Sequence, residues 1–196
     1  MWSTARTRGV SPVCYDLPVI DYIRLYAPTD ASPTGKIALE YVKALLRIAP
    51  VRVISMSGPS AFTGPWEGYQ RLAAVAKAQA ETYVNAVCAP PDRWTFWMRA
   101  KMPNRDGSFE VASERVELWT KGVRNLLLAT DHPSGASAED TLAQLATAQK
   151  YDAIAVPTAD LAAWWLAKGI TAHVIKVPVE HNALRRLVLG DPVQPA

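Results

Sequence analysis

Asp131 and His132 are the two adjacent residues best suited by type and position to catalyse a reaction. They directly follow a strongly apolar segment, residues 123–130, which is typical of a buried strand. Open α/β sheets place their chemistry at the carboxyl ends of parallel strands, and an imidazole can act as a base near neutral pH. We therefore regard His132, with Asp131, as the catalytic candidate. The alternative is a surface histidine in the turn before Pro133.

A second candidate site lies in the loop after the first predicted strand, where Gly35 and Lys36 suggest a comparison with phosphate-binding loops. A P-loop requires glycine where Asp30 stands and serine or threonine where Ile37 stands, so the motif is absent. A strand end, small residues and a helix N-terminus can still receive an anion or a hydroxyl-rich ligand. The alternative is a tight turn with no ligand. The candidate binding residues are Asp30, Thr34, Gly35 and Lys36.

The remaining reactive residue types predict no metal site. His173 falls inside a predicted strand and His181 in the loop after it, and the three histidines lack metal-ligand spacing. Cys14 and Cys88 form neither a disulfide framework nor a metal motif. We expect a cytoplasmic protein with free thiols.

Two strand–helix–strand units, one near each end of the chain, are expected to position these residues. In the first, strands at 19–26 and 51–55 flank a helix that Ser32 caps and that runs to about residue 48. In the second, strands at 151–156 and 173–177 flank a helix that Thr158 caps and Gly169 ends. Crossovers of about a dozen residues imply parallel pairing.

The middle of the chain is less regular. Helical spacing of apolar residues predicts one long helix over residues 66–87, and short strands are expected at 93–99 and 114–119. After the strand at 123–130, Ser137 should cap a helix through residue 149, with Asp140 completing a capping box. The alternation predicts an α/β fold: a single Rossmann-like domain with a mostly parallel sheet and helices on both faces.

Length and composition fit one globular domain. The chain has 196 residues, of which 49% are hydrophobic and 20% charged, and its net charge of +3 is too small to indicate nucleic-acid binding. No apolar run reaches the roughly 18 residues of a membrane span. We expect an N-terminal arm over 1–18, the domain over 19–185 and a C-terminal tail over 186–196.

Three segments together resemble GT-B glycosyltransferases, especially those of family 4. Residues 19–55 resemble the opening strand, loop, helix and second strand of that fold. Residues 151–181 resemble the end of its N-terminal domain, and the segment LLLATDHP resembles the strand and loop that carry a functional histidine. In the family an aspartate commonly follows this histidine, whereas here Asp131 precedes it. The resemblance covers residues 19–185 and implies half of a GT-B fold.

This resemblance implies a glycosyltransferase-like acceptor-side domain without the family's C-terminal donor domain. The chain would then bind no cofactor itself, and a nucleotide sugar could bind only if another chain supplied the donor domain. Partners implied are a sugar or glycosyl acceptor and a second copy or second protein. The alternative is a non-catalytic structural or accessory protein of a larger assembly. Seven tryptophans, including Trp164 and Trp165, fit either core packing or an interface.

Overall fold

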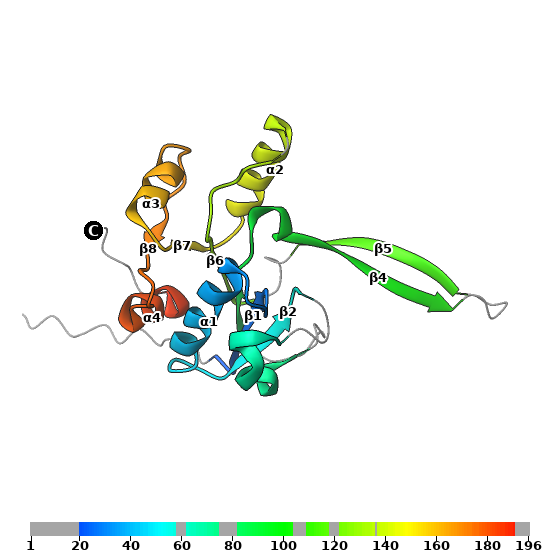
Figure 1. The fold of residues 1–196 in the computed structure, drawn as a ribbon. Helices are drawn as coiled ribbons and strands as arrows, with labels where there is room; N and C mark the ends of the chain where they lie inside the picture. Colours follow the sequence, from blue (N-terminus) through cyan, green and yellow to red (C-terminus); the bar gives the residue numbers. More distant parts are fainter. Residues whose placement is uncertain are drawn as a thin grey trace, which may run out of the picture.

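The computed structural model describes residues 20–57, 62–74, 82–103, 109–117, 122–135 and 137–190. Figure 1 shows its elements along the chain. The strands are β1 (Tyr22–Ala27), β2 (Val51–Ser55), β3 (Tyr83–Val87), β4 (Thr95–Pro103), β5 (Phe109–Glu117), β6 (Arg124–Leu128), β7 (Ala153–Val156) and β8 (His173–Val174). The α-helices are α1 (Pro33–Leu45), α2 (Ala138–Ala148), α3 (Ala159–Leu166) and α4 (His181–Leu189), and two 3-10 helices are η1 (Gly64–Leu72) and η2 (Pro91–Arg93).

Six strands form one sheet in the order β2-β1-β3-β6-β7-β8, and every neighbouring pair is parallel. In the middle of β1, Leu25 is level with Val53 of β2 and with Ala86 of β3. The strands predicted at 19–26, 51–55, 123–130, 151–156 and 173–177 are all present in this sheet and all parallel, although β8 is shorter than expected. The prediction of a parallel α/β sheet is confirmed.

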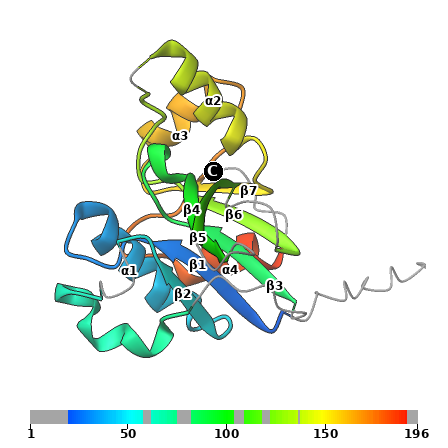
Figure 2. The same cartoon turned by 90° about the vertical axis from the view of Figure 1, so that its right-hand side faces the viewer.

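Helices cover both faces of the sheet. Side chains alternate between the two faces along each strand, so one strand contributes to both cores. Ile23 and Leu25 of β1 pack in one core with α1, α4 and η1, whereas Tyr26 belongs to a second core with α2 and α3. Figures 1 and 2 show α1 on one side of the sheet and α2 and α3 on the other. The chain therefore forms a Rossmann-like α/β domain.

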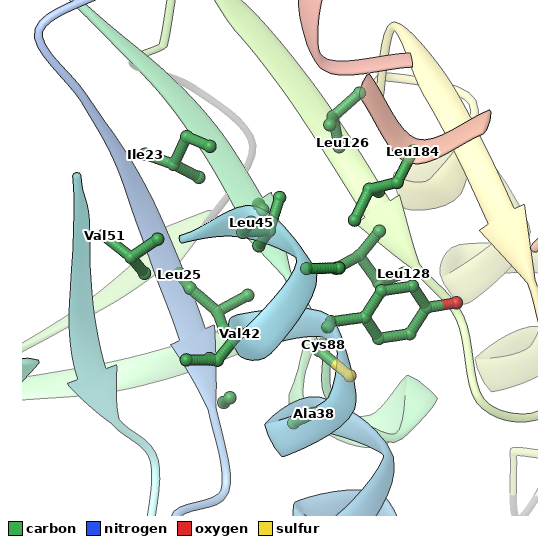
Figure 3. Close-up of a cluster of buried hydrophobic side chains, with 14 of the residues drawn as sticks. Ile23, Leu25, Ala38, Val42, Leu45, Val51, Cys88, Leu126, Leu128 and Leu184 are labelled. Atoms are coloured by element: carbon green, nitrogen blue, oxygen red, sulfur yellow. The ribbon is translucent and has the colours of Figure 1, made fainter. Parts of the chain in front are cut away.

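The first core is built where the apolar stripe of α1 meets the central strands. Ala38, Val42 and Leu45 recur at helical spacing and are all fully buried. Figure 3 shows Val42 and Leu45 among Ile23 and Leu25 of β1, with the leucines of β6 beyond them. Fully burying a valine or leucine side chain contributes roughly 1.5–3 kcal/mol, so this layer holds α1 against the sheet.

Three helix starts follow from local capping, as the sequence predicts. The Ser32 hydroxyl accepts a hydrogen bond from the Gly35 backbone N–H, and the Thr158 hydroxyl does the same for Leu161. Ser137 and Asp140 form a reciprocal capping box at α2. All three caps follow the carboxyl ends of strands, so they begin helices at one edge of the sheet.

The long helix predicted over residues 66–87 is wrong. Gly64–Leu72 forms the 3-10 helix η1, and Tyr83–Val87 forms the central strand β3. Every residue of β3 is buried, because helices or loops cover both faces of this strand. A strand buried on both faces lacks the strict polar–apolar alternation of a half-buried strand, so its pattern is easily mistaken for part of a helix.

Two further features depart from the sequence prediction. The strands expected at 93–99 and 114–119 exist as β4 and β5, which pair antiparallel in a separate two-stranded ribbon that extends away from the domain (Figure 1). Helix α4 was not predicted, and it crosses the domain boundary placed after residue 185. Its buried Leu184, Leu187 and Val188 join the core beside α1. The predicted N-terminal arm lies outside the described residues.

Candidate functional site

The candidate site is the carboxyl edge of the sheet near β1 and β3. From β1 the chain adds β2 on one side and β3 on the other, so the winding direction changes between β1 and β3. Open α/β sheets bind ligands in the crevice at such a switch point. The loops that border it follow β1, β3 and β6.

The loop after β1 is organised by the carboxylate of Asp30. Its Oδ1 accepts a hydrogen bond of 2.9 Å from the Ser32 backbone N–H, and its Oδ2 accepts one of 2.6 Å from the Ser57 hydroxyl. Hydrogen bonds from Ser32 and Ser57 hold the pKa of Asp30 below its ordinary value, and the side chain of Ser32 contributes most. Nearby Arg93 lowers that pKa further. Asp30 is therefore a charged residue whose two oxygens shape the loop.

A chain of hydroxyl groups ties this loop to the end of β2. Thr29 Oγ1 and Ser55 Oγ lie 2.7 Å apart, and the Ser57 hydroxyl accepts a bond from the Thr29 backbone N–H. Ser55 and Ser57 are half-buried, and Thr29 is fully buried. These bonds join the end of β1 to the end of β2 and hold the two strand ends in a fixed relation.

The next turn of the chain is closely packed around Gly35. A Cβ atom at this position would overlap the carbonyl oxygen of Asp30, so only glycine fits without a shift. The Gly35 carbonyl accepts a hydrogen bond of 2.9 Å from the indole Nε1 of buried Trp66. Thr34 is half-buried and Lys36 is exposed in the same turn. Gly35 thus shapes the loop through its backbone, whereas Lys36 is accessible to a ligand.

The Asp131–His132 pair is more open. The side chains of His132 and Asp131 are 47% and 66% exposed. Asp131 Oδ1 accepts a hydrogen bond from the His132 backbone N–H and lies 3.6 Å from His132 Nδ1. That separation is too long for a hydrogen bond, but a carboxylate there favours a proton on Nδ1 and leaves Nε2 as the acceptor. The geometry suits a base directed away from Asp131.

The ring of Trp164, on helix α3 of the neighbouring strand–helix unit, contacts the His132 ring. The ring centroids of His132 and Trp164 are 5.1 Å apart, and Trp164 lies edge-on to buried Trp165. Trp165 in turn stacks on Trp94, whose indole donates to the Ala89 carbonyl in the loop after β3. A row of rings therefore connects the loops after β3 and β6. The outward member of the tryptophan pair is Trp164, which is half-buried.

Both predicted groups, the loop that carries Asp30 and the Asp131–His132 pair, lie at one edge of the sheet. Within the described residues, no hydrogen bond joins them. Strand β3 separates β1 from β6, so the two loops start about 10 Å apart at the usual spacing of strands. The loop after β3 lies between them and carries exposed Arg93. Arg93 was not predicted to belong to the site, because the sequence placed it at the start of the strand expected over 93–99.

The cysteine and the two other histidines in the described residues are buried or half-buried. Burial raises the pKa of the Cys88 thiol to about 12, so this free cysteine is not a nucleophile. Burial, and secondarily Arg124, lowers the pKa of His173. His181 is half-buried at the start of α4. Within the described ranges, no three His, Cys, Asp or Glu residues gather as a metal site would require.

Comparisons with known proteins leave the family open. No protein-family model, curated protein or solved structure matches the chain. Among the helices in the part of the chain that the structure describes, none has both the length and the apolar character needed to span a membrane. The function is therefore argued from the site itself.

Proposed function

We propose that this chain is a glycosyltransferase-like acceptor-side domain, in which His132 serves as the base. The observation that supports it best is the position of His132. Its half-exposed imidazole follows β6 at the carboxyl edge, with Asp131 beside Nδ1 and Trp164 against its ring. A half-exposed imidazole can take a proton from an acceptor hydroxyl that reaches it.

Charged and polar groups of the neighbouring loops provide contacts for such an acceptor. Arg93 and Lys36 are exposed cations near the switch point, and each can donate hydrogen bonds to hydroxyl or anionic oxygens. Asp30 and Ser57 hold the loop that presents Lys36. A hydroxyl-rich ligand that reaches from this loop to His132 would pass over the loop after β3.

In this proposal the donor sugar binds outside the domain described above. Calorimetry of the isolated chain with UDP-, GDP- and ADP-glucose should show no binding tighter than about 1 mM, which corresponds to about 4 kcal/mol. Micromolar binding of any of these nucleotide sugars would contradict the proposal that the donor site lies elsewhere. Binding that appears only after a second protein is added would support it.

The second candidate is a non-catalytic structural or accessory role. It is favoured by the β4–β5 ribbon, in which two nine-residue strands pair with each other and, among the described residues, with no other strand. Isolated two-stranded ribbons are marginally stable in water, and their edges are available for pairing. Deleting residues 95–117 should abolish a role of this kind. The same deletion should leave a histidine-dependent reaction measurable.

A further inference from the structure

We propose that the outer surface of helices α2 and α3 binds a second copy of this chain in a two-fold symmetric dimer. We define the α2–α3 surface by the exposed residues Leu142, Ala146, Ala159, Ala163, Leu166 and Ala167. This inference goes beyond the proposed function, because it concerns neither the carboxyl-edge loops nor a donor domain.

The apolar character of this surface is the first argument. Leu142 of α2 and Leu166 of α3 are each 66% exposed, the highest values among the large apolar side chains in the described residues. Seven of the eight residues of α3 are apolar, Asp160 being the exception. A helix that is apolar on all sides is normally buried on all sides, yet only Trp165 of α3 is fully buried. The outer face of α3 therefore lacks a cover within the described part of the chain.

The two helices present this surface together. Both are crossovers between parallel strands on the same face of the sheet, and Figures 1 and 2 show them on the same side. Leu145 of α2 packs in the same core cluster as Leu161 and Ala162 of α3. Ala159, Ala163 and Ala167 recur every four residues along the exposed side of α3, so a partner helix can approach closely.

The charges at the ends of the helices select a second copy as the partner. Exposed Glu139 and Asp160 lie in the first turns of α2 and α3, and exposed Lys150 and Lys168 follow their last turns. Both helices run in the same direction, so the acidic residues mark one end of the surface and the lysines the other. A two-fold axis across the middle places the acidic end of one copy against the basic end of its partner. An isologous antiparallel contact therefore matches apolar residues and charges at once.

Sedimentation velocity over ~10 to ~500 µM protein, a range in which micromolar dimers form, tests the association. We expect a dimer whose population rises with concentration. Leu166→Glu and Leu142→Glu should each weaken it at least roughly tenfold, since each replaces an exposed apolar side chain of this surface with a carboxylate that the contact would bury. Val123→Glu is the matched control, because Val123 is 60% exposed in the loop before β6, and it should leave association unchanged.

Charge reversal tests the two-fold arrangement separately from folding. Asp160→Lys should weaken the dimer, and the double variant Asp160→Lys with Lys168→Asp should restore it, because the opposite charges again meet. Circular dichroism should be unchanged in all variants, since every substituted side chain is exposed. A monomer of 21.4 kDa at every concentration would overturn the proposal. A dimer that withstands both leucine substitutions, or one that the double reversal fails to restore, would overturn it as well.

Discussion

The loop after β1 and the loop after β6 lie at the same edge of the sheet, but they are held by different contacts. In the first, both carboxylate oxygens of Asp30 accept hydrogen bonds, and the indole of Trp66 donates a hydrogen bond to the Gly35 carbonyl. In the second, His132 is half exposed and is held mainly by one ring contact. The comparison separates a scaffold loop from a loop whose reactive group is available. Substitutions in the first should alter stability, whereas those in the second should alter binding.

Among substitutions that test this difference between the loops, Trp66→Ala should cause the largest loss of stability. The side chain is fully buried against the first core and donates to the Gly35 carbonyl, so its loss should lower the free energy of unfolding by about 3–5 kcal/mol. Urea denaturation measures this change. Trp66→Phe keeps most of the packing and should cost only about 1 kcal/mol for the lost hydrogen bond and the smaller ring. Equal losses in both variants would contradict the role of the ring volume.

Asp30→Ala should have the next largest effect. It removes the acceptor of the Ser32 backbone N–H and of the Ser57 hydroxyl, and we expect a loss of about 1–3 kcal/mol by urea denaturation. Asp30→Asn keeps one carbonyl acceptor and should lose less. If the alanine variant is as stable as the wild type, Asp30 does not organise the loop, and the comparison between the two loops fails.

The same carboxylate predicts an acid dependence of stability. Its folded-state pKa lies below the ordinary 3.8, so its contribution is present above that pH and is lost as the pH falls through the folded value. Thermal denaturation between about pH 5 and 2 should therefore show a shallower decline in Asp30→Asn than in the wild type. Parallel curves for the two proteins would show that Asp30 has the same pKa in both states.

The smallest effect on stability is expected from His132→Ala. The side chain is half exposed, and exposed substitutions usually change the free energy of unfolding by less than about 0.5 kcal/mol. Trp164→Ala is the comparison, because it removes a half-buried ring that packs on Trp165, and it should cost more. Chemical denaturation of both variants measures the difference. A large loss from His132→Ala would place this residue in the scaffold.

Local chemistry explains which parts of the fold can be predicted from the sequence. Ser32, Ser137 and Thr158 act on backbone groups three residues away, so their caps are visible in the sequence. Strand β3 could not be recognised in the same way, because its apolar residues are buried by helices and loops distant in the chain. Helix α4 was likewise not predicted, and its buried Leu184, Leu187 and Val188 depend on packing against other elements.

The candidate site shows the same division. Asp131 and His132 could be proposed because they follow a strong strand pattern directly. The role of Arg93 could not, since it depends on a neighbour, Asp30, that the sheet brings close from another loop. The ring contact between His132 and Trp164 likewise joins residues from two different strand–helix units.

The central claim is that the carboxyl edge between these loops binds a hydroxyl-rich ligand beside His132. Its most direct test is a titration of the 15N-labelled chain with a panel of methyl glycosides, observed through backbone amide shifts. We predict that at least one glycoside shifts the amides of Lys36, Arg93 and His132 together, and that His132→Ala weakens this binding without changing the fold. Glycoside binding that leaves all three amides unshifted, or no binding across the panel, would contradict the account.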